Sequence, residues 1–262
     1  MVILKNKIFI IISVIIILIS FSYGFISRHF QLFPYNLIYA LYSTVEEPEA
    51  PGYREITKED IYWANEVKKG GYILHFRHAQ REKWTDVTAF DGWELINKLD
   101  ASKETFSRAT CLTPRGVEEA KLIGNIFKLH NIKVSQIITS PSCRARQTSI
   151  HAFGSVGTIV NSLLHRTAMS PVQHEDMANN LRNHVNKIEV LNGENVILSG
   201  HGGTLRFDET IFFDSNEVGE LDDRHEGGFI IIEKTDDGKI VAKYKYKTFR
   251  RFAVAAIELE TN

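Results

Sequence analysis

The stretch YILHFRHA, residues 72–79, decides how this chain folds. It follows Gly70 and Gly71, and its first five residues are mainly apolar, as in a strand buried within a sheet. An arginine, a histidine and an alanine come directly after them. The stretch therefore predicts a buried strand over 72–76 that presents Arg77 and His78 at its carboxyl end.

Strand and helix signals alternate after this first strand. Thr113 and Pro114 predict the N-cap and first turn of an amphipathic helix that ends before Asn131. The other expected elements are strands at 134–139 and 195–199, helices at 143–153 and 175–190, and a closing hairpin of 228–233 and 240–247. This order predicts an α/β fold with a mostly parallel sheet and helices on both faces.

Polar side chains follow three of the expected strands. Arg77 and His78 follow the first strand, a segment ending in Arg144 follows the second, and Gly200 and His201 follow the third. Ligands of such sheets bind beyond the carboxyl ends of the strands. Two arginines and two histidines are therefore expected to meet at one edge of the sheet.

This set of side chains suits phosphoryl transfer through a histidine. Arg77 and Arg144 would hold phosphate oxygens with bidentate, permanently charged donors. His78 would attack phosphorus, and His201 would bind the equatorial oxygens. Backbone N–H groups near Cys143 and at the Gly202 turn would add donors. Neither a metal nor a cofactor is required.

Four sequence blocks carry a resemblance to a known family. They are FRHA (76–79), LTPRG (112–116), SPSCRARQT (140–148) and SGHGGT (199–204). In order and context they resemble the histidine phosphatase superfamily, whose fold is phosphoglycerate-mutase-like. The resemblance implies a three-layer α/β/α sandwich, a phosphorylated His78, and a phosphate pocket formed by Arg77, Arg144 and His201. A membrane segment before such a domain is similar to extracytoplasmic members, some of which act on phosphorylated envelope glycans.

The chain departs from the family pattern at the position where many members carry an acidic residue after the histidine. Many members have a glutamate where this chain has Gln80. Members of the mutase-like branch usually take the general acid from the segment between the second arginine and the second histidine, which implies Glu175 here. Asp176 and Asp86 remain alternatives, and a carboxylate in a first helical turn also serves simply to favour the helix dipole.

The segment between Ala79 and Cys111 is longer than a strand-to-helix connection needs to be. It mixes charged and aromatic side chains, so we interpret it as a specificity loop. Arg81 and Trp84, together with Gly202, are the predicted substrate-binding residues. Trp84 would alternatively serve only in packing.

The N-terminal region predicts a membrane segment. Residues 8–25 contain no charge, and a helix of this length spans roughly 27 Å. Lys5 and Lys7 precede the segment, which favours a cytoplasmic N-terminus and a catalytic domain outside the cytoplasm. We expect an anchor or signal segment at 1–27, a juxtamembrane linker at 28–54 and the phosphatase domain at 55–262. A signal peptide cleaved after small residues at 22–24, giving a secreted or periplasmic protein, is the alternative.

Composition and cysteine content argue against several other classes of protein. The chain is 44% hydrophobic and 24% charged, as globular proteins are, and its formal net charge of −1 argues against a nucleic-acid binder. Cys111 and Cys143 are too few for a disulfide framework and too far apart for a Cys-x-x-Cys site. In an oxidising compartment they could pair, and the sequence leaves open whether they do.

The sequence thus favours a metal-independent phosphomonoesterase that works through a phosphohistidine. Its expected partners are a small phosphoester, such as a phosphorylated sugar or glycan, and the membrane. A phosphomutase and a catalytically inactive phosphate-binding scaffold remain the alternatives. The oligomeric state is left open.

Overall fold

The computed structural model describes residues 56–81, 111–164, 171–202, 204, 218, 221, 226–235 and 239–258, with the side chains of 171–174 left out. Its helices are α3 (Lys58–Lys69), α5 (Pro114–Leu129), α6 (Cys143–Phe153), α7 (Pro171–Asn186), α8 (Phe249–Glu258) and the short 3-10 helix η1 (Asn161–Leu163). Its strands are β1 (Ile73–Arg77), β2 (Val134–Thr139), β3 (Thr158–Ile159), β4 (Asn195–Gly200), β5 (Phe229–Lys234) and β6 (Ile240–Tyr246).

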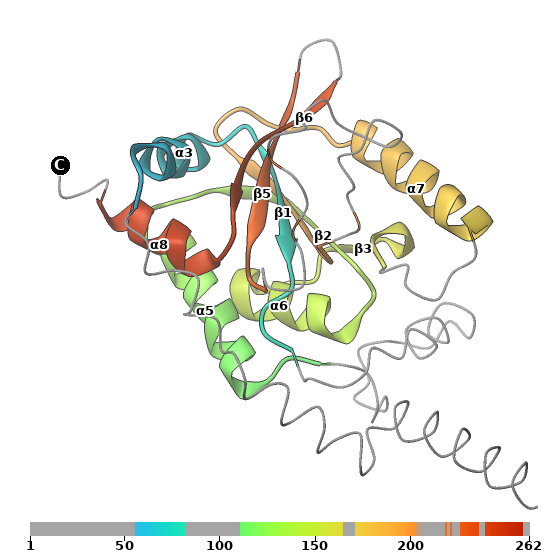
Figure 1. Ribbon diagram of the computed structural model, residues 1–262, viewed down its shortest axis with the longest axis horizontal. Coiled ribbons are helices and arrows are strands. Elements are labelled where there is room, and N and C mark those ends of the chain that lie inside the picture. Colours follow the sequence, from blue (N-terminus) through green and yellow to red (C-terminus); the bar gives the residue numbers. More distant parts are fainter. Residues whose placement is uncertain are drawn as a thin grey trace, which may run out of the picture. The chain divides into compact units, whose positions relative to one another are not determined.

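The described strands form one six-stranded sheet in the order β3-β2-β4-β1-β5-β6 (Figure 1). The pairings of β3 with β2, β2 with β4 and β4 with β1 are parallel. Strand β5 runs antiparallel to both β1 and β6. The mostly parallel sheet and the closing hairpin are confirmed, and β5 makes the sheet mixed.

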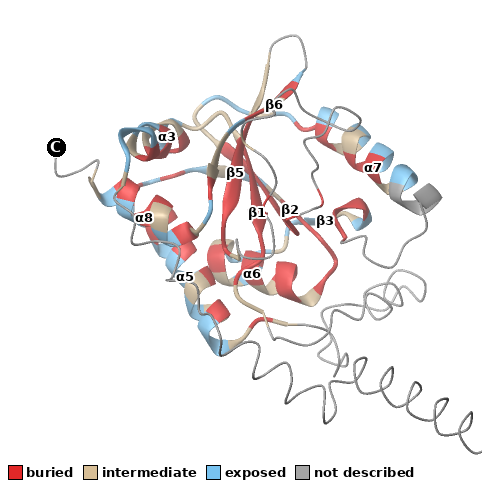
Figure 2. Cartoon of the chain, in the orientation of Figure 1, coloured by how far each residue is buried: buried red, intermediate tan, exposed pale blue. Residues whose placement is uncertain are grey.

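Helices cover both faces of this sheet. Alternate residues of each strand point to opposite faces, so Phe76 and Leu74 pack against α3, α5 and α8, whereas Ile73 packs with residues of α7 and η1. Figure 2 shows the buried strands between these two helical layers. The first layer is rich in aromatic rings, and Phe76 stacks on Phe229 with 4.6 Å between ring centroids. The observed architecture is the expected three-layer α/β/α arrangement.

Helix α7 differs from its prediction. It begins at Pro171 and ends at Asn186, whereas the sequence pattern placed it at 175–190. Proline is favoured in the first turn of a helix because its missing N–H would be unpaired there, and Pro171 sets this earlier start. The predicted strand at 72–76 is likewise shifted by one residue, so that Arg77 is its last residue.

Helices α3 and α8, which the sequence reading did not identify, are joined through Asp60. The carboxylate of Asp60 caps α3 through Thr57 and accepts a hydrogen bond from Arg251 Nε at 2.6 Å. Tyr244 Oη donates to the same carboxylate at 2.9 Å. This ion pair, with its buried carboxylate, connects the first described helix to the last.

The predicted anchor, residues 1–27, lies outside the described residues, as does the linker at 28–54. Within the part of the chain that the structure describes, no helix combines the length and the apolar character needed to span a membrane.

Candidate active site

His78 lies immediately beyond β1, where backbone hydrogen bonds fix its position. Its N–H donates to the carbonyl of Gly200 at 3.1 Å, and its carbonyl accepts from Gly227 N–H at 3.0 Å. The ring Nδ1 lies 2.9 Å from the carbonyl oxygen of Ala79. A carbonyl only accepts, so Nδ1 carries the proton and Nε2 keeps its lone pair. Nε2 is the atom that can act as a nucleophile.

The surroundings keep His78 neutral. Burial, followed by the positive charges of Arg144 and Arg77, lowers the pKa of His78 well below its usual value. Arg81 acts in the same direction. An unprotonated imidazole at neutral pH is what a nucleophilic histidine requires.

His201 faces His78 from the end of the neighbouring parallel strand. The two ring centroids are 5.4 Å apart, in an edge-to-face arrangement. His201 Nδ1 lies 3.3 Å from Arg144 Nη2, and its Nε2 lies 3.2 Å from both Ser140 Oγ and Ser142 Oγ. Because a guanidinium only donates, Nδ1 is the acceptor in this arrangement and Nε2 carries the proton toward the serines.

Two buried arginines supply the positive charge of the site. Arg77 ends β1 and is 5% exposed, and Arg144 in the first turn of α6 is 1% exposed. Ser142 is the N-cap of α6 and its Oγ accepts from Ala145 N–H, so the positive end of the helix dipole lies beside Arg144. Such a combination attracts an anion with several oxygens, and a phosphate dianion fits it best.

The loop after His78 is held from two sides. Ala79 N–H donates to Thr148 Oγ1 at 3.0 Å, and Gln80 N–H donates to Glu119 Oε2 at 3.0 Å. Gly116 permits this approach, because a Cβ there would lie 1.9 Å from the Gln80 carbonyl oxygen. The sequence reading missed Glu119, whose pKa is raised mainly by burial. Nothing in the sequence separates it from its exposed neighbour Glu118.

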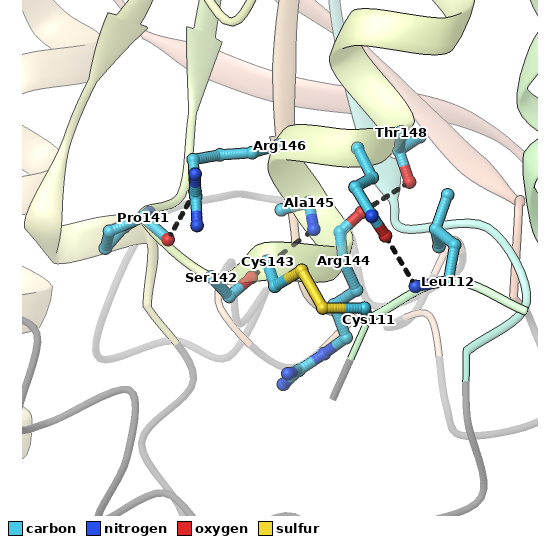
Figure 3. The surroundings of a disulfide bond; sticks show 10 residues. Cys111, Leu112, Pro141, Ser142, Cys143, Arg144, Ala145, Arg146 and Thr148 are labelled. Carbon is cyan, nitrogen blue, oxygen red and sulfur yellow. Dashed lines mark hydrogen bonds between the residues drawn. A yellow bond between two sulfur atoms is a disulfide. The ribbon is translucent and has the colours of Figure 1, made fainter. Parts of the chain in front are cut away.

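A disulfide between Cys111 and Cys143 ties the start of α6 to the segment before α5 (Figure 3). Their Cα atoms are 5.1 Å apart, and Cys143 directly precedes Arg144. Gln147 reinforces the connection, because its Oε1 accepts from Leu112 N–H at 2.7 Å. The bond that the sequence allowed is thus formed directly beside the buried Arg144.

The predicted substrate-binding residues have different surroundings. Arg81 forms an isolated bridge with Leu112 and lies 3.9 Å from a carboxylate oxygen of Glu226. Gly202 lies against Leu221, whose carbonyl oxygen would be 1.8 Å from an added Cβ. Trp84 and Asp86 lie outside the described residues, as does most of the predicted specificity loop.

The predicted general acid lies on α7. Glu175 and Asp176 are both exposed there, and the role of either as an acid stays a prediction. Within the described ranges, no three His, Cys, Asp or Glu side chains gather in a way that would hold a metal ion.

Comparison with known proteins gives similarity only at the level of solved structures. No family model matches the sequence, and no curated protein matches it. The structure of the protein histidine phosphatase SixA bound to tungstate covers 66% of this chain and 95% of its own, with 14% identity and a TM-score of 0.41. A mycobacterial glucosyl-3-phosphoglycerate phosphatase with VO3 covers 68% and 98%, with 13% identity and a TM-score of 0.44.

A third similar structure is a putative alpha-ribazole-5'-P phosphatase from Escherichia coli K-12, which covers 68% of this chain and 98% of its own, with 13% identity and a TM-score of 0.39. At these scores the fold of this chain rests on its own strand order and directions, and its chemistry rests on the site.

Proposed function

We propose that this chain is a histidine phosphatase, a phosphomonoesterase that forms a phosphohistidine at His78 Nε2. The observation that carries the proposal is the position of His78, buried between Arg77 and Arg144 with its Nδ1 proton held by Ala79 and its ring 5.4 Å from His201. A neutral nucleophile surrounded by cationic donors is built for attack on a phosphate ester.

The proposed reaction has two steps. In the first, the Nε2 lone pair attacks phosphorus, a P–N bond forms, and the P–O bond to the alcohol breaks. The leaving oxygen takes a proton from a carboxylic acid, for which Glu175 is the first candidate and Asp176 and Asp86 are the others. In the second step, the carboxylate left by the first step takes a proton from water, the water oxygen attacks phosphorus, the P–N bond breaks, and inorganic phosphate leaves with His78 neutral again.

The charged side chains act mainly by positioning and by electrostatic stabilisation. Arg77 and Arg144 hold the non-bridging oxygens while negative charge moves from the ester oxygen to the transferred group. The Nδ1–H hydrogen bond to Ala79 fixes the ring plane and stabilises the positive charge that the ring acquires as Nε2 becomes bonded to phosphorus.

The proposed substrate is a small phosphoester, and a phosphorylated sugar or glycan is the preferred class. Arg81 supports this choice, because it lies close enough to the site to influence the His78 pKa and opens the segment that contains Trp84. A cation and an aromatic ring together suit a polar molecule with a flat sugar face.

We also propose that the domain works outside the cytoplasm, attached by the segment at 8–25 or released by its cleavage. The Cys111–Cys143 disulfide supports this location, because disulfides persist in oxidising compartments. Labelling with a thiol-alkylating reagent during rapid denaturation of intact cells, without reductant, tests it: two unlabelled cysteines are expected, and two labelled ones would contradict it.

The test of function is phosphate release by the full chain from an aryl phosphate, in the presence of a chelator, with His78→Ala as the comparison. We expect the wild type to release phosphate, to bind radioactive phosphate covalently in an acid-labile form, and to lose both properties with His78→Ala. Retained turnover in that variant would exclude His78 as the nucleophile.

The same assay separates the alternatives. A scaffold binds vanadate but neither releases phosphate nor becomes labelled. A phosphomutase becomes labelled but passes the phosphoryl group to an acceptor, so little free phosphate accumulates.

A further inference from the structure

A third histidine lies beneath the candidate site, in the middle of β1. His75 is fully buried and points to the same face of the sheet as Arg77, two residues further along the strand. Its Nε2 lies 3.1 Å from the carbonyl oxygen of His201. His75 therefore contacts the backbone of the second pocket histidine across the β1–β4 pair, while the proposed reaction makes no direct use of it.

The protonation of His75 follows from this contact. Because the His201 carbonyl only accepts, Nε2 of His75 must carry a proton. Burial, opposed by hydrogen bonding to the backbone of His201 and Leu198, lowers the pKa of His75 to about 4, so the ring is neutral at neutral pH. Its Nδ1 is then an acceptor, and no donor reaches it among the described residues.

A histidine at this position is costly for the fold. Its neighbours on the same face include Ile73 and Leu198, and an apolar side chain would fill the space without burying an unpaired nitrogen. Residues that break local packing rules in this way are expected where a fold serves a site. What the histidine provides, and leucine would not, is the hydrogen bond to the His201 carbonyl.

That hydrogen bond fixes the peptide group from which the His201 side chain departs. The same carbonyl also accepts from Thr204 N–H at 3.2 Å, so two donors hold it in one orientation. Gly200, the preceding residue, accepts the N–H of His78 at 3.1 Å. The backbone is thereby tied to His78 at Gly200 and to His75 at His201.

We propose that His75 is a positioning residue: its Nε2–H holds the His201 carbonyl and so keeps the His201 ring in contact with Arg144 and 5.4 Å from the His78 ring, beside the phosphorus that His78 attacks. This inference rests on the proposed function. It predicts that losing the donor weakens stabilisation of the transition state more than it weakens binding of phosphate, which Arg77 and Arg144 still hold.

The experiment compares His75→Leu with His75→Gln in the full chain. Leucine removes the donor, whereas the glutamine amide places an N–H at about the reach of the histidine Nε2. We expect His75→Leu to lower kcat about 10- to 100-fold, as a misplaced catalytic group does, with little change in KM. His75→Gln is expected to recover most of that loss.

Two binding measurements accompany the kinetics. Vanadate, which adopts the five-coordinate geometry of the transferred group, is expected to bind His75→Leu at least about tenfold more weakly, and inorganic phosphate nearly as tightly as the wild type. His130→Leu alters another buried histidine, at the end of α5, and serves as the control for general loss of packing. This variant is expected to bind both vanadate and phosphate as tightly as the wild type.

The outcomes are distinct. Equal kcat and equal vanadate affinity in His75→Leu and the wild type would overturn the role of His75, and so would a His75→Gln variant as impaired as His75→Leu. If instead the wild type neither turns over an aryl phosphate nor binds vanadate, the proposed function itself is overturned.

Discussion

The imidazole rings of His78 and His201 meet edge to face at the carboxyl ends of two adjacent parallel strands, with 5.4 Å between their centroids. The register of those strands places Arg77 opposite Gly200, and His78 and His201 are the residues that follow this pair. The sheet therefore brings the backbones of the two histidines side by side, and contacts beyond the strand ends, such as that of His75 with the His201 carbonyl, set the final positions of the rings.

Arg144→Lys is expected to weaken catalysis while leaving the fold unchanged. Lysine keeps the charge but loses the planar pair of donors, and one lost hydrogen bond to a charged group corresponds to about a 10- to 100-fold fall in kcat/KM. Steady-state kinetics and circular dichroism measure the two properties. Arg182→Lys, at a partly exposed position of α7, is the matched control, and an equal loss in both variants would argue against a specific role for Arg144.

Gly202→Ala is expected to impair both activity and stability. An added Cβ would lie 1.8 Å from the Leu221 carbonyl oxygen and 3.3 Å from Arg77 Nη1, so the chain at 221 or the turn must move. Overpacking of this kind costs about 1–3 kcal/mol. Urea unfolding and phosphatase assays test the expectation.

Gly200→Ala provides the comparison for that variant. A Cβ at position 200 would meet its nearest atom, the Leu163 carbonyl oxygen, at 3.5 Å, which is ordinary van der Waals contact. We expect this neighbouring substitution to be tolerated. Equal damage by both substitutions would show that the turn rejects any side chain, and that the close approach to Leu221 is not the cause.

Reduction of the Cys111–Cys143 disulfide is expected to destabilise the domain by about 3–4 kcal/mol, as the closure of a chain segment whose ends are 32 positions apart implies. Urea midpoints with and without dithiothreitol measure the change. A Cys111→Ser/Cys143→Ser variant should resemble the reduced wild type and should not respond to the reductant. A wild type with the same midpoint in both conditions contradicts the prediction.

Acidification is expected to destabilise the fold through buried histidines. The folded-state pKa of His75 is about 4, and that of His78 also lies well below the usual value of 6.5. Below about pH 6.5 the unfolded chain therefore takes up protons that the folded chain does not, and stability falls as the pH decreases. Between pH 7 and pH 5 the lowered pKa of His75 corresponds to a loss of about 2 kcal/mol, and His78 acts in the same direction.

His75→Leu tests that pH dependence, since it removes one of the two groups. Urea unfolding at pH 7 and pH 5 is expected to show a smaller difference in the free energy of unfolding for the variant than for the wild type. An unchanged difference would mean that His75 does not contribute.

Much of the fold was predictable because its strongest signals are local. The apolar run before Arg77 and the Thr113–Pro114 start of a helix both specify their elements within a few residues, and both elements are observed. Helix α3 also has a local signal, the capping box of Thr57 with Asp60, which the sequence reading did not use. Strand β3 has only two residues, too few for any periodic pattern.

The site was predictable only in part, for a different reason. Arg77, His78, Arg144 and His201 follow strand ends, so the placement rule for α/β sheets brings them together. Contacts such as those of His75 and Glu119 depend on which buried groups face each other across elements. Those contacts form only when distant elements pack together, so local sequence patterns do not predict them.

The parallel pairing of β1 with β4 joins Ile73 to Val196, residues from opposite halves of the domain. No short fragment of the chain can hold both histidines in place, so the anion site comes into existence only when the sheet has assembled. Phosphate or vanadate that binds only the folded chain will therefore stabilise the native state, by about 2.7 kcal/mol at a concentration 100 times the dissociation constant. A rise in melting temperature with vanadate would thus report the intact topology even before any substrate is known.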